Sequence, residues 1–349
     1  MNIGELFIVG YDGLFPPEPL LSAAERGDIG GVILFSRNFS DLDQLMTTTE
    51  ALRSRAFPRR FLIAVDHEGG RVQRFGAPFT KIPPFSKFGS RGDLHLAERV
   101  AQLAARELSA AGITLNLSPV ADVLTNPENS VIGDRSASGN PETTASFVKS
   151  MVRGLQSGGI AACAKHFPGH GHTLADSHEE VPIDPRPIEQ VQDCDFVPFY
   201  TAIEAGVAAI MTAHLINPSV DPLHPATLSH TFLTQLLRNY LRFDGAIITD
   251  DLEMKAISLQ WSVAEAALLA LQAGADLLLV CHHWEEAISA KERVEREAAG
   301  GKLSHRRVDS ALQHAVALKN RFPGKPLPLD RGIAKRIIGC PEHQKWANV

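Results

Sequence analysis

The chain has 349 residues, of which 44% are apolar and 21% charged, the balance of an ordinary globular protein. Its 34 basic and 40 acidic side chains give a formal net charge of −6, and no basic run or aromatic-interleaved patch is present. This charge argues against binding nucleic acid through its phosphates. The four cysteines are widely spaced without a CxxC pair, which favours free thiols in a reducing compartment. We therefore expect a cytoplasmic protein.

The apolar segments argue against a membrane protein. The most apolar stretch, residues 266–281, is interrupted by Gln272 and Asp276 and is too short for a bilayer helix. The first residues, MNIGELFIVGYDG, lack a basic region and carry Glu5 among their apolar residues. They predict a first strand and not a signal peptide.

Short apolar runs of strand length recur along the chain, with helical stretches between them. Most of these runs are continuous and do not alternate with polar residues, as expected when both faces of a parallel sheet are covered. The eight predicted strands are residues 6–10, 31–35, 61–66, 114–117, 160–165, 208–212, 246–249 and 276–281.

Helical periodicity marks several of the intervening segments. Residues 97–111 and 231–241 each place their apolar side chains on one stripe. Ser262 precedes a third such segment, residues 263–273, and Gly274 follows it, as residues that cap the two ends of a helix do. These segments are predicted helices.

Eight strands that alternate with helices predict a single (β/α)₈ barrel of the TIM type. We expect the barrel to span residues 1–322 and a short, proline-containing tail, residues 323–349, to pack on its outside. An open doubly wound sheet is the alternative. The absence of GxGxxG after the first strand weakens its dinucleotide-binding version.

Polar residues follow most of the predicted strands, where barrel enzymes hold their active sites. They are Asp66 after the third strand, Asp122 and Arg135 after the fourth, Lys165 and His166 at the fifth, His214 after the sixth, and Asp250 and Asp251 after the seventh. Charged groups rarely end apolar strands unless they are paired or functional. Their convergence on one rim predicts an active site.

The segment KHFPGHGHTLADSH, residues 165–178, holds four histidines and Asp176. Imidazole and carboxylate are common zinc and iron ligands, so a metal-dependent hydrolase is one interpretation. Because Lys165 would repel a cation, we expect no metal and no cofactor. For His170 and His172, a structural role that holds this loop to the rim fits the sequence as well as a functional role does. The sequence therefore assigns no role to them.

Asp176 and His178 are two residues apart and point the same way in an extended segment. The carboxylate would then fix the tautomer of His178 and leave its other ring nitrogen to exchange a proton with substrate. Asp250 is a candidate nucleophile or electrostatic stabiliser. Its neighbour Asp251 is a candidate structural residue, because adjacent residues on a strand face opposite sides.

The element KHFPGHG at 165–171, followed after four residues by DSH at 176–178, closely resembles the bacterial β-N-acetylglucosaminidases of glycoside hydrolase family 3. These are the NagZ-type enzymes of peptidoglycan recycling. The further matches are GGVILFSRN at 30–38, DHEGGRVQRF at 66–75, SPVADV at 118–123, IGDRS at 132–136, MTAH at 211–214 and ITDDLEM at 248–254. They follow one another in the family's own order.

The resemblance implies a single (β/α)₈ barrel and a retaining exo-β-N-acetylglucosaminidase, which would remove terminal N-acetylglucosamine from GlcNAc-anhydroMurNAc muropeptides. Asp250 would be the nucleophile that forms a covalent glycosyl-enzyme, with His178 as the acid/base and Asp176 as its partner. The implied sugar-binding residues are Asp66, Arg74, Arg135, Lys165 and His166. The family also implies a monomer whose only partner is a small carbohydrate.

Other activities stay open on the sequence alone. A β-N-acetylglucosaminide phosphorylase would use the same site with phosphate as the acceptor, since a histidine acid/base repels an anion less than a glutamate does. A metal-dependent hydrolase built on the histidine cluster is a further alternative, and a barrel that binds sugar without turning it over is another.

Overall fold

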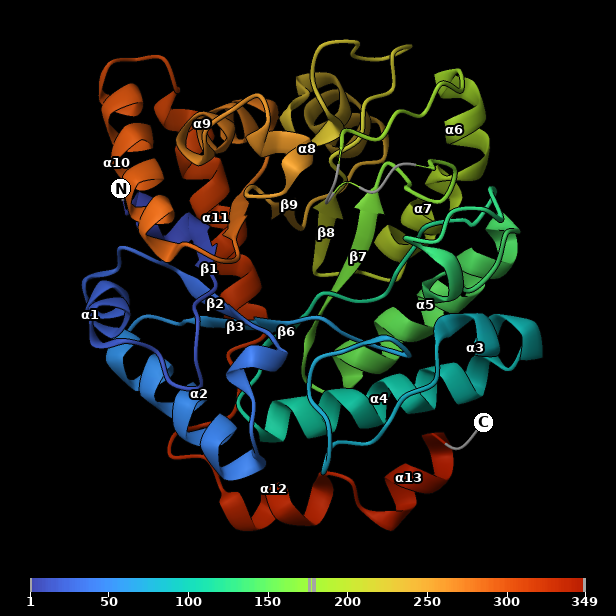
Figure 1. The fold of residues 1–349 in the computed structure, drawn as a ribbon, viewed down its shortest axis with the longest axis vertical. Coiled ribbons are helices and arrows are strands. Elements are labelled where there is room, and N and C mark those ends of the chain that lie inside the picture. The colour runs from blue at the N-terminus through green and yellow to red at the C-terminus, as the bar shows by residue number, and fades with distance from the viewer. Residues whose placement is uncertain (1, 175–176, 178–179, 348–349) are drawn as a thin grey trace.

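The computed structural model describes residues 2–174, 177 and 180–347 of the chain. Within these residues eight parallel strands close into a barrel in the order β1-β10-β9-β8-β7-β6-β3-β2, which confirms the predicted fold (Figure 1). The strands are β1 (Phe7–Val9), β2 (Gly31–Leu34), β3 (Leu62–Val65), β6 (Leu115–Asn116), β7 (Ala161–Phe167), β8 (Ala209–Thr212), β9 (Ala246–Asp251) and β10 (Leu277–Val280). Every predicted strand overlaps one of them. A separate antiparallel hairpin, β4 (His67–Gly69) and β5 (Val72–Gln73), follows β3.

Helices surround the barrel and cover its outer face (Figure 1). They are α1 (Glu18–Arg26), α2 (Leu42–Ala56), α3 (Phe85–Arg91), α4 (Leu94–Ala110), α5 (Pro141–Ser157), α6 (Ile188–Cys194), α7 (Phe196–Glu204), α8 (Lys255–Ser258), α9 (Val263–Ala273), α10 (Trp284–Ala299), α11 (His305–Arg321), α12 (Arg331–Ile337) and α13 (Pro341–Ala347). Short 3₁₀ turns are η1 (Ile3–Leu6), η2 (Ser36–Asn38), η3 (Gly133–Arg135) and η4 (Ala226–Leu228). No helix among the described residues is long and apolar enough to span a bilayer.

The ends of the helices follow from their capping residues. Ser262 accepts a hydrogen bond from the N–H of Glu265, whose carboxylate accepts one from the Ser262 N–H in return, so α9 begins where the sequence predicts. By contrast, α4 begins at Leu94, three residues before the predicted start. The side chain of Asp93 accepts from the N–H of Leu96 and caps the helix there.

The segment predicted as a helix over 231–241 is helical, but it is a π-helix, η5 (Thr231–Tyr240). The N–H of Leu241 donates to the carbonyl of Leu236, five residues earlier. Phe232 and Leu237 are also five residues apart, and both are buried. The apolar spacing of this segment therefore fits a π-helical turn as well as an α-helical one.

The last two helices, α12 and α13, both pack against α4 (Figure 1). A buried glutamate on α4, Glu107, holds them there. Its carboxylate accepts from the N–H of Gly339 at 2.9 Å and from Nδ1 of His343 at 2.7 Å. It also accepts from the backbone N–H and the hydroxyl of Thr80, at 2.9 and 2.6 Å. One carboxylate thus joins three segments that are distant in sequence.

We expect Glu107→Ala to lower the free energy of unfolding by about 3 kcal/mol, because it leaves several buried donors without an acceptor. Urea unfolding followed by circular dichroism measures this change. Arg106→Ala changes an exposed position on the same helix and should leave the unfolding midpoint near that of the wild type. Equal midpoints for the two variants would show that Glu107 does not secure the tail.

Candidate active site

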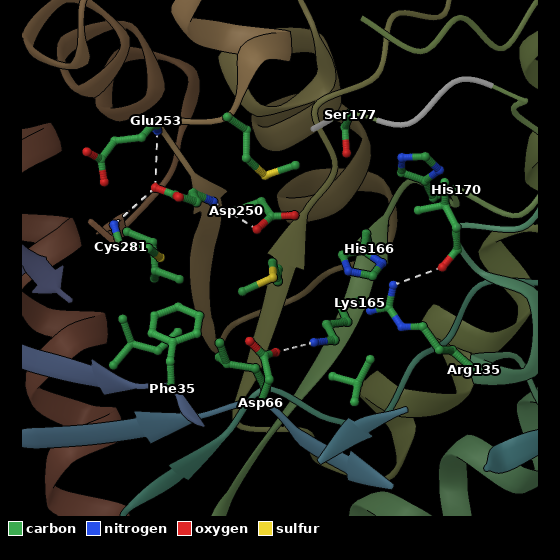
Figure 2. Close-up of a pocket in the computed structure, with 18 of the residues that line it drawn as sticks. Phe35, Asp66, Arg135, Lys165, His166, His170, Ser177, Asp250, Glu253 and Cys281 are labelled. Carbon is green, nitrogen blue, oxygen red and sulfur yellow. Dashed lines mark hydrogen bonds and ion pairs between the residues drawn. The ribbon is translucent and has the colours of Figure 1, made fainter. Parts of the chain in front are cut away.

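A cavity of about 510 Å³ opens at the carboxyl ends of the barrel strands. This volume suits a sugar-sized ligand. Six of the predicted site residues line the cavity: Asp66, Arg74, Arg135, Lys165, His166 and Asp250. Figure 2 shows Lys165 and His166, both on β7, and Asp250, on β9, pointing toward the same space. The other two predicted residues, Asp176 and His178, lie outside the described residues, whereas Ser177 between them is buried and lines the cavity.

One wall of the cavity is a chain of alternating charges. The ammonium of Lys165, at the end of β7, lies 2.6 Å from Asp66 Oδ1 and 2.7 Å from Glu68 Oε1. Asp66 Oδ2 lies 3.7 Å from Arg74 Nη2. Although burial disfavours the ammonium ion, the carboxylates of Asp66 and Glu68 raise the pKa of Lys165, so the side chain is charged at neutral pH.

Arg135 extends this charged wall through Glu68. Its Nε and Nη2 donate to the two oxygens of that carboxylate, each at 2.9 Å. Sequence reasoning missed Glu68, although the available signal was its spacing of two from Asp66, which favours the same side of an extended segment. We call Asp66, Glu68, Arg74, Arg135 and Lys165 the charged wall.

Beside the charged wall, His166 is held by Asp122. Oδ2 of Asp122 lies 2.8 Å from His166 Nδ1, and Oδ1 accepts from the backbone N–H groups of His166 and His170. Asp122 is fully buried, which disfavours its charge, but His166 and His170 keep the pKa of this carboxyl below its usual value. A carboxylate at Nδ1 selects the tautomer whose Nε2 is an acceptor, and this nitrogen is the one left for a ligand.

We expect Asp122→Asn to lower kcat/KM by about 10²-fold, because the amide does not fix the imidazole tautomer as a carboxylate does. The assay is hydrolysis of a chromogenic β-N-acetylglucosaminide, the substrate class that the sequence resemblance implies, with the melting temperature measured in parallel. A variant that keeps both the wild-type kcat/KM and the wild-type melting temperature would contradict this role of Asp122.

Asp250 lies near the carboxyl end of β9, and the N–H of Asp251 donates to its Oδ1 at 2.8 Å. Burial disfavours the carboxylate, but electrostatic interaction with His214 and His166, that N–H group and Lys165 together hold the pKa of Asp250 below its usual value. Asp250 is therefore ionised at neutral pH. An ionised carboxylate is what a nucleophile or an electrostatic stabiliser requires.

The next residue, Asp251, has a different environment. Its Oδ1 accepts from the N–H groups of Glu253 and Cys281, both at 3.1 Å, so it ties the turn after β9 to the end of β10. Burial is the main cause that raises the pKa of Asp251 to about 7. These contacts agree with the structural role expected for it. His214, which was also predicted at this rim, forms hydrogen bonds with the hydroxyl of Thr227 and with the carbonyl of Asp251.

The two histidines without a predicted role hold loops together. Thr173 Oγ1 lies 2.8 Å from His170 Nδ1, and Thr125 Oγ1 lies 3.0 Å from His172 Nδ1. His170 also lines the cavity. Among residues 2–174, 177 and 180–347, no group of three histidine, cysteine or carboxylate side chains is arranged to hold a metal ion.

The comparisons with known proteins agree on one family. Residues 18–318 match the family model of the glycosyl hydrolase family 3 N terminal domain. The chain is 43% identical over 265 residues to a β-hexosaminidase of Methylobacillus flagellatus, and the match covers 74% of this chain and 75% of that protein. A similar match to the β-hexosaminidase of Chromobacterium violaceum has 43% identity over 278 residues and covers 76% of this chain and 77% of that protein.

Solved structures of the same family superpose well on this chain. A family 3 β-N-acetylglucosaminidase from Paenibacillus sp. str. FPU-7 gives a TM-score of 0.93 at 36% identity, and the match covers 99% of this chain and 66% of that longer one. NagZ from Neisseria gonorrhoeae, solved in complex with N-trifluoroacetyl-D-glucosamine, gives 0.79 at 32% identity and covers 99% and 96%. The chain therefore belongs to glycoside hydrolase family 3, where it is a β-hexosaminidase of the NagZ type that acts on N-acetylhexosamine.

Proposed function

We propose that this chain is a retaining exo-β-N-acetylglucosaminidase that removes terminal N-acetylglucosamine from peptidoglycan fragments of the GlcNAc-anhydroMurNAc type. The observation that carries this proposal is the ionised carboxylate of Asp250 in a sugar-sized cavity, beside a wall of buried and half-buried charged groups. Glycosyl transfer has a positively charged transition state at the anomeric carbon. An anionic Asp250 stabilises that charge and then forms a covalent bond to the same carbon.

The leaving oxygen needs a proton, and the proposed donor is His178, oriented by Asp176. After the aglycone departs, the same imidazole takes a proton from the water that attacks the glycosyl-enzyme. The support for this pair is the KHFPGHG-x₄-DSH pattern and the position of Ser177, which lies between the two residues in sequence and lines the cavity.

The terminal sugar is proposed to bind through Asp66, Arg74, Arg135, Lys165 and His166. Carboxylate, guanidinium and ammonium groups make short, directional bonds to hydroxyl groups, so a set of them fixed around a cavity selects one arrangement of hydroxyls. The relative from Neisseria gonorrhoeae was solved with an N-acylated glucosamine, which supports a ligand of this kind. A monomer in the cytoplasm is also proposed, and the four cysteines, all of which are free thiols, support the reducing compartment.

The proposed function is tested by release of p-nitrophenol from its β-N-acetylglucosaminide and from its β-glucoside, with EDTA present throughout. We expect rapid turnover of the first substrate, little of the second, and no effect of EDTA. Loss of activity in EDTA that zinc restores would instead favour the metal-dependent hydrolase.

A second arm adds inorganic phosphate and follows the products by mass spectrometry. Free N-acetylglucosamine as the product supports hydrolysis. Conversion to a sugar 1-phosphate, at a rate that rises with phosphate, would instead favour the phosphorylase.

A further inference from the structure

One member of the charged wall bridges two of the others and does not itself line the cavity. Glu68, in β4, is 2% exposed and lies behind Asp66, Arg135 and Lys165, all of which do line it. We propose that Glu68 is a positioning residue that aims Arg135 and Lys165 at the terminal sugar, an inference that rests on the proposed function of the same cavity.

The geometry of Glu68 is that of a bridge between two cations. The guanidinium of Arg135 comes from η3, after β6, and the ammonium of Lys165 comes from β7. The carboxylate takes a two-pronged hydrogen bond from the guanidinium and lies 2.7 Å from the ammonium nitrogen. A planar guanidinium held by two parallel bonds has a fixed orientation, which a single contact does not give.

The remaining N–H groups of Arg135 show what this orientation serves. Of its five N–H donors, two go to Glu68, and one on Nη1 goes to the carbonyl of Val131 at 3.3 Å. These three bonds leave one N–H on Nη1 and one on Nη2 without a partner among them. Because Arg135 lines the cavity, these two donors are the ones that could bind a ligand there. Rotation of the guanidinium would turn both of these donors away from the same ligand at once.

Glu68 also balances the charge of the two cations. Although burial disfavours its ionised form, Arg135 and Lys165 hold the pKa of Glu68 far below its usual range, so it is anionic at every working pH. Arg135 and Lys165 repel one another, as the lowering effect of Arg135 on the pKa of Lys165 shows. With a neutral side chain at position 68, that repulsion would push the two cations apart.

A purely structural role for Glu68 makes a different prediction, and Glu107 supplies the matched control. Glu107 is also 2% exposed and has several hydrogen-bond partners, but it secures the tail and does not line the cavity. Glu68→Gln and Glu107→Gln therefore make the same change, from a carboxyl group to an amide, at similarly buried positions. If the role of Glu68 is purely structural, both variants should lower the melting temperature, and neither should change kcat or KM selectively.

The test measures kcat and KM on p-nitrophenyl β-N-acetylglucosaminide, the inhibition constant of N-acetylglucosamine, and the melting temperature. We expect Glu68→Gln to lower kcat/KM by about 10²-fold, the order expected for misplaced binding groups, and to weaken inhibition by the free sugar. Glu68→Asp keeps the charge and should recover part of this loss. Glu107→Gln should lower the melting temperature and leave kcat and KM at the wild-type values.

A double-mutant cycle with Arg135→Gln separates an effect transmitted through Arg135 from an independent one. In the Arg135→Gln background, Glu68→Gln should cost about tenfold or less, because one of its two targets is already gone. Equal losses in both backgrounds would overturn the proposal, and so would a Glu68→Gln variant with wild-type kcat/KM.

The proposal and the proposed function fail in distinguishable ways. A wild-type chain that does not hydrolyse the substrate contradicts the proposed function. Calorimetric titration with N-acetylglucosamine then tests Glu68 by itself. Weaker binding in Glu68→Gln than in the wild type and Glu107→Gln supports the positioning role, and equal binding in all three overturns it.

Discussion

Asp250→Ala is expected to lower kcat on the p-nitrophenyl substrate by about 10⁴-fold or more, the largest effect of any single substitution in this chain. The variant loses both the charge that stabilises the transition state and the oxygen that would bond to the anomeric carbon. Because Asp250 belongs to the proposed reaction and not to the packing of the barrel, its melting temperature should stay close to that of the wild type.

The adjacent carboxylate offers a matched control for this substitution. Asp251→Asn keeps an oxygen that accepts from the N–H groups of Glu253 and Cys281, so we expect it to retain most of the activity. Azide, a small anionic nucleophile, should restore turnover to Asp250→Ala and yield a glycosyl azide of inverted configuration. A large loss of activity in Asp251→Asn, with near-normal activity in Asp250→Ala, would show that Asp250 is not the nucleophile.

The barrel could be predicted from the sequence because its strands are buried on both faces. Such strands are continuous apolar runs, and eight of them separated by helices permit few other folds. Element limits were less predictable, since they depend on single capping bonds such as that of Asp93 to the N–H of Leu96. The π-helical form of residues 231–240 was missed as well, because α-helical and π-helical spacing differ by one residue and the apolar pattern fits both.

The candidate site was predictable in its position and less so in its pairings. A parallel barrel brings the carboxyl ends of all its strands to one rim, so the polar residues at the carboxyl ends of Leu62–Val65, Ala161–Phe167 and Ala246–Asp251 had to meet. Which of them would pair depends on side-chain geometry that no spacing specifies. Asp122 was noted at the rim, but its bond to His166 was not foreseen, and Glu68 was missed.

A residue that supports the site from behind is therefore harder to identify from the sequence than a residue that lines the site. Asp66 and Asp250 end strands, where an acid is conspicuous, whereas Glu68 is one polar residue in the polar segment VDHEGG. Its importance follows only from burial between two cations. The roles of Asp176 and His178 stay proposals for a different reason, because both lie outside the described residues.

His178→Ala is expected to distinguish an acid/base from a binding residue through its dependence on the leaving group. A disaccharide of N-acetylglucosamine has a poor leaving group that needs a proton, so its kcat/KM should fall by about 10³-fold. A 2,4-dinitrophenyl glycoside leaves as a stable anion and needs little help in the first step, so its kcat/KM should fall far less. Removal of the glycosyl group from Asp250 still lacks a base, so the covalent enzyme should accumulate and the dinitrophenol should appear as a burst equal to the amount of enzyme.

The neighbouring histidine provides the matched variant for this experiment. His172 belongs to the same histidine-rich segment and bonds Thr125, so His172→Ala tests whether any imidazole lost from this segment has the same effect. We expect its kcat/KM to change little and by the same factor for both leaving groups. If His178→Ala loses equal activity on the disaccharide and the dinitrophenyl glycoside and shows no burst, proton transfer is not the step that this histidine serves. In that case the acid must be sought among the carboxyl groups of the cavity, where Asp251, with its pKa raised to about 7 mainly by burial, holds a proton in the right pH range.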